Sequence, residues 1–290
     1  MVNWLIYIRV ARAHTLAMSA GPILCTYFYS RLKYSHLHLK PFIFVAIAVL
    51  LFHLATNTIS EYRDFIRGVD DGNIDGPKYR LVSGIIEPTK IKRLGTGAFS
   101  LASISGIIAL ALSSMILLIP GIIGAGLSLF YSEWPLRYKY KSFGEIGVFI
   151  AYGPLLFFSC LYSLVERVCI EDMLLSIPIG LLTMCVLLAN NVRDYAFDRG
   201  RIKTLPTVIG LKGSYTILFS SVHLSFLCIP ILIYARIIPP PGFLVLIAWP
   251  IIHLAIKQMD SPKFVDIFGI MQASYCNILW PILAYLHKAQ

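Results

Sequence analysis

The chain has 290 residues, of which 57% are hydrophobic and only 14% are charged. Soluble globular domains carry about 25% charged residues, so this composition excludes a soluble domain and indicates a helical protein within a lipid bilayer. The net charge of +10 does not indicate a nucleic-acid partner, because the basic residues are spread over short loops. The six cysteines include no CxxC pair, which argues against both a disulfide framework and a zinc site.

Apolar windows of about 20 residues, each long enough to cross a bilayer core of about 30 Å as a helix, recur along the whole chain. They predict nine spans, at residues 13–30, 41–61, 92–111, 114–132, 144–165, 172–192, 213–234, 241–258 and 266–287. We therefore expect an all-α polytopic membrane protein that forms one domain over residues 1–290.

The loops between these spans differ in charge. If the N-terminus is cytoplasmic, the loops on that side hold roughly a threefold excess of Lys and Arg, in the sense of the positive-inside rule. The same count places the ends of the second and sixth spans on the cytoplasmic face. We expect this arrangement in the cell membrane of a prokaryote.

Acidic side chains interrupt the apolar sequence in two segments, residues 57–84 and residues 190–204. Carboxylates at or near membrane depth are costly, so they indicate a functional site. In the first segment Asn57, Glu61 and Asp64 are spaced i, i+4 and i+7, which places them on one face of a helix.

The second segment repeats this pattern. Asn190, Asp194 and Asp198 are spaced i, i+4 and i+8 on a helix, and Asn191 lies three residues before Asp194. Sets of carboxylate and amide oxygens suit Mg²⁺, which is usually shared with the phosphates of a substrate. No His or Cys joins either stripe, which argues against zinc or iron. The sequence predicts that the two segments together hold Mg²⁺ and a diphosphate.

Basic residues accompany both acidic segments and the loop between the fourth and fifth spans. They are Lys78 and Arg80, then Arg137, Lys139 and Lys141, and finally Arg193, Arg199, Arg201 and Lys203. Basic side chains and metal ions together neutralise phosphate groups, so these residues are candidate diphosphate contacts. For each of them, retention of basic residues on the cytoplasmic side is the alternative explanation.

Three stretches resemble the signatures of the UbiA superfamily of intramembrane prenyltransferases. They read NTISEYRDFIRGVD followed by GPKYRLVSG, then YSEWPLRYKYKSFGE, and finally NNVRDYAFDRGRIKT. The spacing from Asn57 to Asp70 is most similar to the MenA branch, which prenylates 1,4-dihydroxy-2-naphthoate in menaquinone synthesis. The resemblance covers essentially the whole chain and implies about nine helices around a central cavity.

The resemblance also implies a role for each matching position. Two Mg²⁺ ions would be held by Asn57, Glu61 and Asp64 and by Asn191, Asp194 and Asp198. Phosphate oxygens would be contacted by Arg80, Lys139 and Lys203, with Lys78, Arg137 and Arg193 as further candidates. In this sequence Glu61 stands where the family usually has Asp, and its longer side chain shifts the carboxylate by about one methylene.

The same resemblance suggests which residues act in the reaction. Asp64 or Asp70 would serve as the base, and Asp194 is a further catalytic candidate as a ligand of the Mg²⁺ that stabilises the departing diphosphate. Tyr62 and Tyr138 would stabilise an allylic cation through their ring faces, although packing at the membrane interface is the alternative for each tyrosine.

The resemblance implies Mg²⁺-dependent transfer of a polyprenyl group from a prenyl diphosphate to an aromatic small molecule. The similarity to the MenA branch favours 1,4-dihydroxy-2-naphthoate as this acceptor. Other acceptors that the sequence leaves open are 4-hydroxybenzoate, homogentisate and geranylgeranylglyceryl phosphate. An ion-coupled transporter is a different alternative, but it would place its carboxylates near the midplane with access from both sides. Here both acidic segments lead into basic loops on one side. A CDP-alcohol phosphotransferase is another alternative, and the absence of that family's opening motif from this sequence argues against it.

Overall fold

The computed structural model describes residues 7–8, 10–69 and 84–250, together with positions 279, 282 and 286. Within these residues the regular elements are helices, which confirms the predicted all-α class. Five of the helices are long and apolar enough to cross a membrane. The predicted span at 266–287 and the second half of the span at 241–258 fall outside the continuously described ranges.

The first four predicted spans are found as helices close to their predicted bounds. They are η1 (Ala13–Leu16) with α2 (Ala17–Lys33), α3 (Leu39–Ile66), α5 (Pro88–Leu112), and η2 (Met115–Leu117) with α6 (Leu118–Phe130). The break before α6 follows the Ser pair in the sequence: Ser114 adopts an extended conformation, and its side chain accepts a hydrogen bond from the backbone N–H of Ile116. The helix α5 begins with Pro88, a residue favoured at the first helical position.

The fifth and sixth predicted spans are each built from several helical segments. The fifth comprises α7 (Gly144–Ile150), the π-helical turn η4 (Ala151–Leu155) and α8 (Leu156–Val165). Proline has no N–H to donate, and Pro154 lies within η4, where the regular α-helical ladder is interrupted. The sixth comprises α9 (Ile170–Met173), α10 (Ser176–Arg193) and α11 (Tyr195–Asp198).

The seventh predicted span is the longest helix, α12 (Leu205–Tyr234), and it is followed by the 3₁₀ helix η5 (Pro240–Ala248). The helix α12 begins earlier than predicted, because a helical segment before Gly210 is joined to the predicted span across a kink at that residue. The φ angle of Gly210 is 77°, a left-handed value that glycine adopts at little cost. Beyond that kink the helix follows the predicted span.

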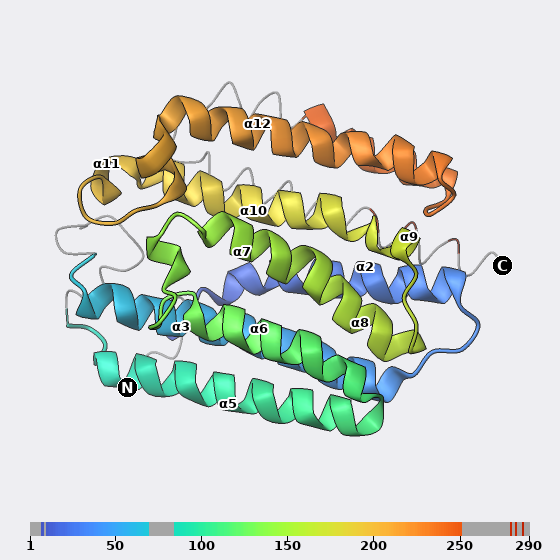
Figure 1. Cartoon of the computed structure of the whole chain (residues 1–290), viewed down its shortest axis with the longest axis horizontal. Helices are drawn as coiled ribbons and strands as arrows, with labels where there is room; N and C mark the ends of the chain where they lie inside the picture. Colours follow the sequence, from blue (N-terminus) through green and yellow to red (C-terminus); the bar gives the residue numbers. More distant parts are fainter. Residues whose placement is uncertain are drawn as a thin grey trace.

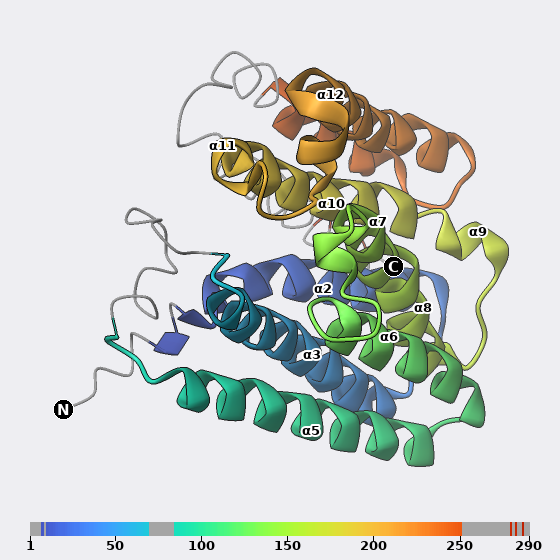
Figure 2. The same cartoon turned by 60° about the vertical axis from the view of Figure 1, so that its left-hand side comes forward.

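The helices lie side by side, with α5 and α12 at opposite edges of the bundle (Figures 1 and 2). The largest hydrophobic core joins α2, α8, α10 and α12 and includes the fully buried side chains of Tyr29, Phe157, Leu182 and Phe226. The backbones of η4 and α10 touch, since a Cβ atom on Gly153 would lie 2.9 Å from the Cα atom of Gly180.

One end of the bundle carries a buried acidic residue that is fully bonded. Asp172 accepts hydrogen bonds from the hydroxyls of Tyr29 (2.5 Å) and Tyr34 (2.7 Å), and it forms an ion pair with Lys33. Because buried charges are stable only when they are paired, this network fastens α2 to α9.

The opposite end of the bundle brings the two acidic segments together. The C-terminal ends of α3 and α10 both lie there, beside the start of α7 and the short helix α11 (Figure 1). The described parts of the two acidic segments, residues 57–69 and 190–204, therefore lie at the same end of the bundle.

Candidate active site

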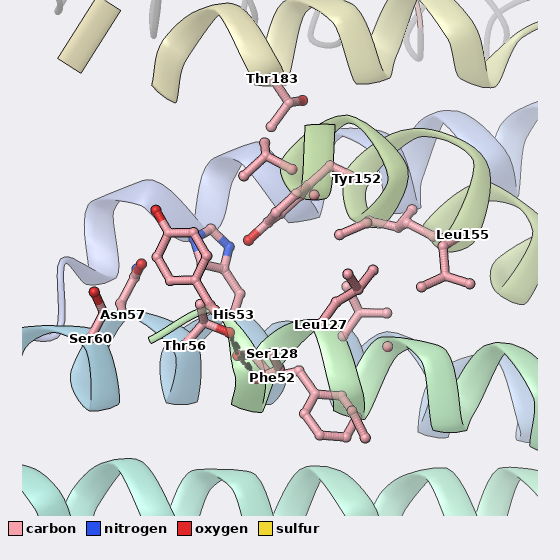
Figure 3. A pocket seen from close by; sticks show the side chains of 18 of the residues that line it. Phe52, His53, Thr56, Asn57, Ser60, Leu127, Ser128, Tyr152, Leu155 and Thr183 are labelled. Atoms are coloured by element: carbon pink, nitrogen blue, oxygen red, sulfur yellow. Dashed lines mark hydrogen bonds between the residues drawn. The ribbon is translucent and has the colours of Figure 1, made fainter. Parts of the chain in front are cut away.

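A cavity of about 450 Å³ reaches into the bundle from the end where the acidic segments meet. Its polar end is lined by members of both acidic segments: Asn57, Glu61, Asp64, Asn190, Asn191, Asp194 and Asp198. Its other walls are mostly apolar and come from α3, α5, α6, η4 and α8, with Val49, Leu110 and Leu155 among them. Figure 3 shows Asn57 and Ser60 at one end of the cavity and Leu155 at the other. The cavity can therefore take a ligand with one charged end and one hydrocarbon end.

The first acidic stripe lies on the last turns of α3, as the spacing predicts. The Asn57 side chain donates a hydrogen bond to the Thr15 hydroxyl (3.0 Å). Glu61 is only 2% exposed and forms an ion pair with Arg12, with 3.3 Å between Oε2 and Nη2. Both contacts join α3 to the residues that immediately precede α2.

Asp64 is fully buried and accepts hydrogen bonds from two residues of the loop between α6 and α7. Tyr140 donates its hydroxyl proton to Asp64 Oδ1 (2.7 Å), and Lys139 forms an ion pair with Oδ2. Lys139 also donates to the Ser60 hydroxyl (2.7 Å). Burial, followed by the nearby Asp64 carboxylate, raises the pKa of Tyr140 above its ordinary value, so the phenol keeps the proton that it donates.

The second acidic stripe differs from the prediction of one continuous helix. The helix α10 ends at Arg193, and Asp194 links it to the short helix α11, because the ψ angle of Asp194 is 3° and departs from helical geometry. Backbone hydrogen bonds bridge the junction, from Asp194 N–H to Asn190 C=O (3.0 Å) and from Asp198 N–H to Asp194 C=O (2.9 Å). The stripe is thus bent, yet its members all line the cavity.

Two side chains hold the polar groups of this second segment. Arg193 donates two hydrogen bonds to the Asp194 carboxylate, at 2.7 and 2.8 Å. The Asn191 amide nitrogen donates to Glu145 Oε1 at 2.8 Å, and Glu145, at the start of α7, is only 2% exposed.

Of the two predicted catalytic tyrosines, Tyr138 lines the cavity and Tyr62 does not. Tyr138 lines the cavity, packs edge-on against Tyr131 at 5.2 Å between ring centroids, and donates its hydroxyl proton to the Leu127 carbonyl (2.6 Å). Tyr62 packs against Ile86 and Ile91 at the outer side of α3 instead.

Several predicted diphosphate contacts are not brought to the cavity wall. Among the described residues, Arg137 and Lys203 do not line the cavity. The backbone carbonyl of Lys203 accepts a hydrogen bond from Ser142 N–H (2.8 Å), which joins the two polar loops. Asp70, Lys78 and Arg80 lie outside the described residues, and their roles stay predictions.

Sequence reasoning missed three residues that line the polar end of the cavity: Arg12, Thr15 and Tyr152. Arg12 adopts a left-handed backbone conformation with a φ angle of 50°, where the chain turns into η1. A signal for it was available, because Arg12 immediately precedes the first predicted span, at the end for which the charge distribution predicts the same side as the acidic segments. No local pattern marks Thr15 or Tyr152.

The donor set of the cavity fits Mg²⁺. Within the described ranges, no three His, Cys, Asp and Glu side chains are close enough to form a metal site by themselves. The acids are divided instead between two segments, each of which adds amide oxygens. Mg²⁺ accepts such a sparse set of oxygen ligands, since it keeps several waters and takes further oxygens from phosphates.

The sequence is similar to known proteins along most of its length. Residues 21–265 match the UbiA prenyltransferase family. The 1,4-dihydroxy-2-naphthoate octaprenyltransferase of Bacillus subtilis is 29% identical, over 83% of this chain and 78% of its own length. The UbiA prenyltransferase domain-containing protein 1 of Homo sapiens is 30% identical, over 78% of this chain and 67% of its own length.

Solved structures share the fold. A UbiA homologue from Archaeoglobus fulgidus, bound to DMAPP and Mg²⁺, superposes with a TM-score of 0.66 at 18% identity, covering 96% of this chain and 99% of that one. An apo UbiA homologue from Aeropyrum pernix K1 gives a TM-score of 0.69 at 15% identity, covering 94% and 98% of the two chains. The match over residues 21–265, the helical fold and the apolar spans together show that this chain is an integral membrane prenyltransferase of the UbiA family.

Proposed function

We propose that this prenyltransferase transfers a polyprenyl group from a prenyl diphosphate to 1,4-dihydroxy-2-naphthoate and depends on Mg²⁺. The observation that carries the proposal is the cavity, which joins two amide-and-carboxylate segments at one end to apolar walls at the other. Such a space matches a substrate with a diphosphate head and a hydrocarbon tail. The naphthoate acceptor is supported by the similarity to the Bacillus subtilis enzyme.

In this proposal the two acidic segments hold the cation and the basic residues hold the diphosphate. Asn57, Glu61 and Asp64 on one side, and Asn191, Asp194 and Asp198 on the other, would bind Mg²⁺, which supplies Lewis-acid stabilisation of the diphosphate when bound. Arg12, Lys139 and Arg193 line the same end of the cavity, and in this proposal they would bind phosphate oxygens.

The reaction that fits this arrangement is an electrophilic substitution. The bond between the allylic carbon and oxygen breaks, and diphosphate leaves with the electron pair. A ring carbon of the acceptor forms the new carbon–carbon bond and then loses CO₂, which restores the aromatic ring. The faces of Tyr131 and Tyr138 border the cavity and can stabilise the allylic cation. The apolar walls exclude water, which would otherwise capture this cation.

We also propose that the N-terminus and both acidic segments face the cytoplasm, as the distribution of Lys and Arg predicts. The relatives named above come from a bacterium and a vertebrate. The assignment to a prokaryotic cell membrane therefore stays a prediction.

The decisive experiment supplies membranes containing the protein with geranyl, farnesyl and longer prenyl diphosphates, and separately with each of four acceptors. These are 1,4-dihydroxy-2-naphthoate, 4-hydroxybenzoate, homogentisate and geranylgeranylglyceryl phosphate. Mass spectrometry of the extracted lipids is expected to detect the prenylated naphthalene product, and only when Mg²⁺ is present. Product formation that survives both EDTA and Asp194→Ala would contradict the proposed metal dependence, and a product with another acceptor would replace the naphthoate.

A further inference from the structure

Two of the amides that line the polar end of the cavity share a feature that their spacing in the sequence does not predict. Each of them, Asn57 and Asn191, has its nitrogen bonded to a hydrogen-bond acceptor outside the acidic stripes. An asparagine side chain has two ends of nearly equal size, and only the oxygen end can bind a cation. Whatever fixes the nitrogen end therefore decides whether the oxygen end is presented to the cavity.

The orientation of Asn57 follows from the acceptors that surround its nitrogen. That nitrogen lies 3.0 Å from the Thr15 hydroxyl oxygen and 3.4 Å from the carbonyl oxygen of Ala11. A carbonyl oxygen only accepts hydrogen bonds, so exchanging the two ends of the amide would set two oxygens against each other. The amide oxygen is accordingly directed away from Ala11.

His53 completes the arrangement around Thr15. The Thr15 hydroxyl donates its proton to the carbonyl oxygen of Arg12 (2.7 Å), so its oxygen is left to accept. His53 Nε2, at 3.1 Å, must then carry the proton toward Thr15, while His53 Nδ1 accepts from the Ser19 hydroxyl at 2.7 Å. Hydrogen bonds thus fix both ring nitrogens of this buried residue, and Figure 3 shows His53 between Asn57 and Tyr152.

Glu145 orients the Asn191 side chain in the same way that Thr15 orients Asn57, by accepting a hydrogen bond from the amide nitrogen. Its Oε1 accepts a hydrogen bond from the Asn191 nitrogen at 2.8 Å, so the amide oxygen is again turned the other way. Glu145 does not line the cavity, and its Oε2 atom is buried with no hydrogen-bond partner among the described residues. A buried carboxylate with one unpaired oxygen is costly to keep, which calls for a function.

We propose that Glu145, and Thr15 with its support His53, are positioning residues that present the amide oxygens of Asn191 and Asn57 to the cation-and-diphosphate site. The inference rests on the proposed function, because it assumes that a cation binds at this end of the cavity. None of the three residues contacts the reacting atoms in this scheme. They act through the two amides, as residues behind the ligands of a metal site do.

The test uses matched pairs of variants of the full chain, purified in detergent. Thr15→Val and Glu145→Leu remove the acceptor at nearly constant volume, whereas Thr15→Ser and Glu145→Gln keep one. Mn²⁺ is the probe, because its free form gives an electron paramagnetic resonance signal that is lost on binding. Each protein is titrated in the presence of a geranyl diphosphate analogue whose prenyl group cannot be transferred.

We expect Thr15→Val and Glu145→Leu to weaken Mn²⁺ binding by about 10–100-fold, the usual range for residues behind metal ligands. Thr15→Ser and Glu145→Gln should bind like the wild type, and thermal unfolding without metal should differ little within each pair. In the background of Asn191→Ala, adding Glu145→Leu should cause no further loss, because the amide that Glu145 orients is gone.

Wild-type binding in both Thr15→Val and Glu145→Leu would overturn the inference and leave the proposed function standing. A further loss on adding Glu145→Leu to Asn191→Ala would show that Glu145 acts by another route, which would also overturn its assignment. If Glu145→Leu fails to fold, the comparison of Thr15→Val with Thr15→Ser decides the outcome. Failure of the wild type itself to bind Mn²⁺ would overturn the proposed function and this inference with it.

Discussion

Replacing Asp64 by asparagine tests whether the buried acid of the first stripe serves the reaction or only the fold. Asp64 is fully buried and accepts hydrogen bonds from Lys139 and Tyr140. The amide side chain of the Asp64→Asn variant would keep the shape and one acceptor oxygen but lose the charge. In the proposed site the Asp64 charge acts by holding Mg²⁺, and weakening a group that stabilises the departing diphosphate typically lowers a rate by roughly 10²–10³-fold, about 3–4 kcal/mol.

The same substitution also affects stability, and its size can be bounded from the contacts. Breaking a buried ion pair costs about 3–5 kcal/mol when one charge is left unpaired in the interior. The Lys139 side chain is 18% exposed and keeps its bond to Ser60, so the charge that it would leave is partly solvated. We expect about 1–3 kcal/mol of lost stability. This is too little to account for the loss of activity well below the melting temperature.

Asp172→Asn is the matched control. Asp172 is also fully buried and also accepts from a lysine and from tyrosines, Lys33 and Tyr34 among them, but it lies at the opposite end of the bundle. Both variants are compared by thermal unfolding and by the yield of prenylated product per folded protein. Asp172→Asn should lose stability and keep its activity. Equal loss of activity in the two variants, or wild-type activity in Asp64→Asn, would refute the reasoning.

Three further substitutions give separate tests. Arg12→Ala should raise the KM for the prenyl diphosphate in steady-state assays, because a charge-assisted hydrogen bond is worth about 1.5–3 kcal/mol, which is tenfold or more. Gly147→Ala should lower kcat, since the new Cβ atom meets the ring of Tyr138. The control Gly97→Ala, whose Cβ has nothing within 4 Å, should leave activity unchanged and should not lower stability, because alanine is favoured over glycine within a helix. Gly180→Ala should lower the melting temperature by separating α10 from η4, at a cost of about 1–3 kcal/mol, and an unchanged melting temperature would contradict the close contact between these helices.

The elements that could be predicted from the sequence are those with a local or periodic signal. The spacing of Asn57, Glu61 and Asp64 places them on one face of any helix, and the structure continues α3 through all three. The alternation of the spans then brings the ends of the second and sixth to one side. Neither conclusion needs a contact between distant residues.

What the sequence could not predict depends on such contacts or on small backbone departures. The partner of Asn191 is Glu145, 46 residues away, and the partner of Glu61 is Arg12, 49 residues away, and no periodic pattern relates them. The bend at Asp194 arises because one residue leaves helical geometry while the hydrogen bonds around it persist. A pattern based on 3.6 residues per turn does not detect such a bend.

Three ion pairs among the described residues of the cavity also differ in when the growing chain can form them. Asp194 has its partner at the adjacent residue, Glu61 has one that precedes it by 49 residues, and Asp64 is joined to Lys139, which follows it by 75 residues. The Arg12–Glu61 pair can therefore form as soon as α3 is synthesised, whereas the Lys139–Asp64 pair must wait until the loop before α7 has been made. During synthesis the second half of α3 carries a carboxylate whose lysine has not yet been made, so this ion pair makes the end of α3 dependent on a later loop.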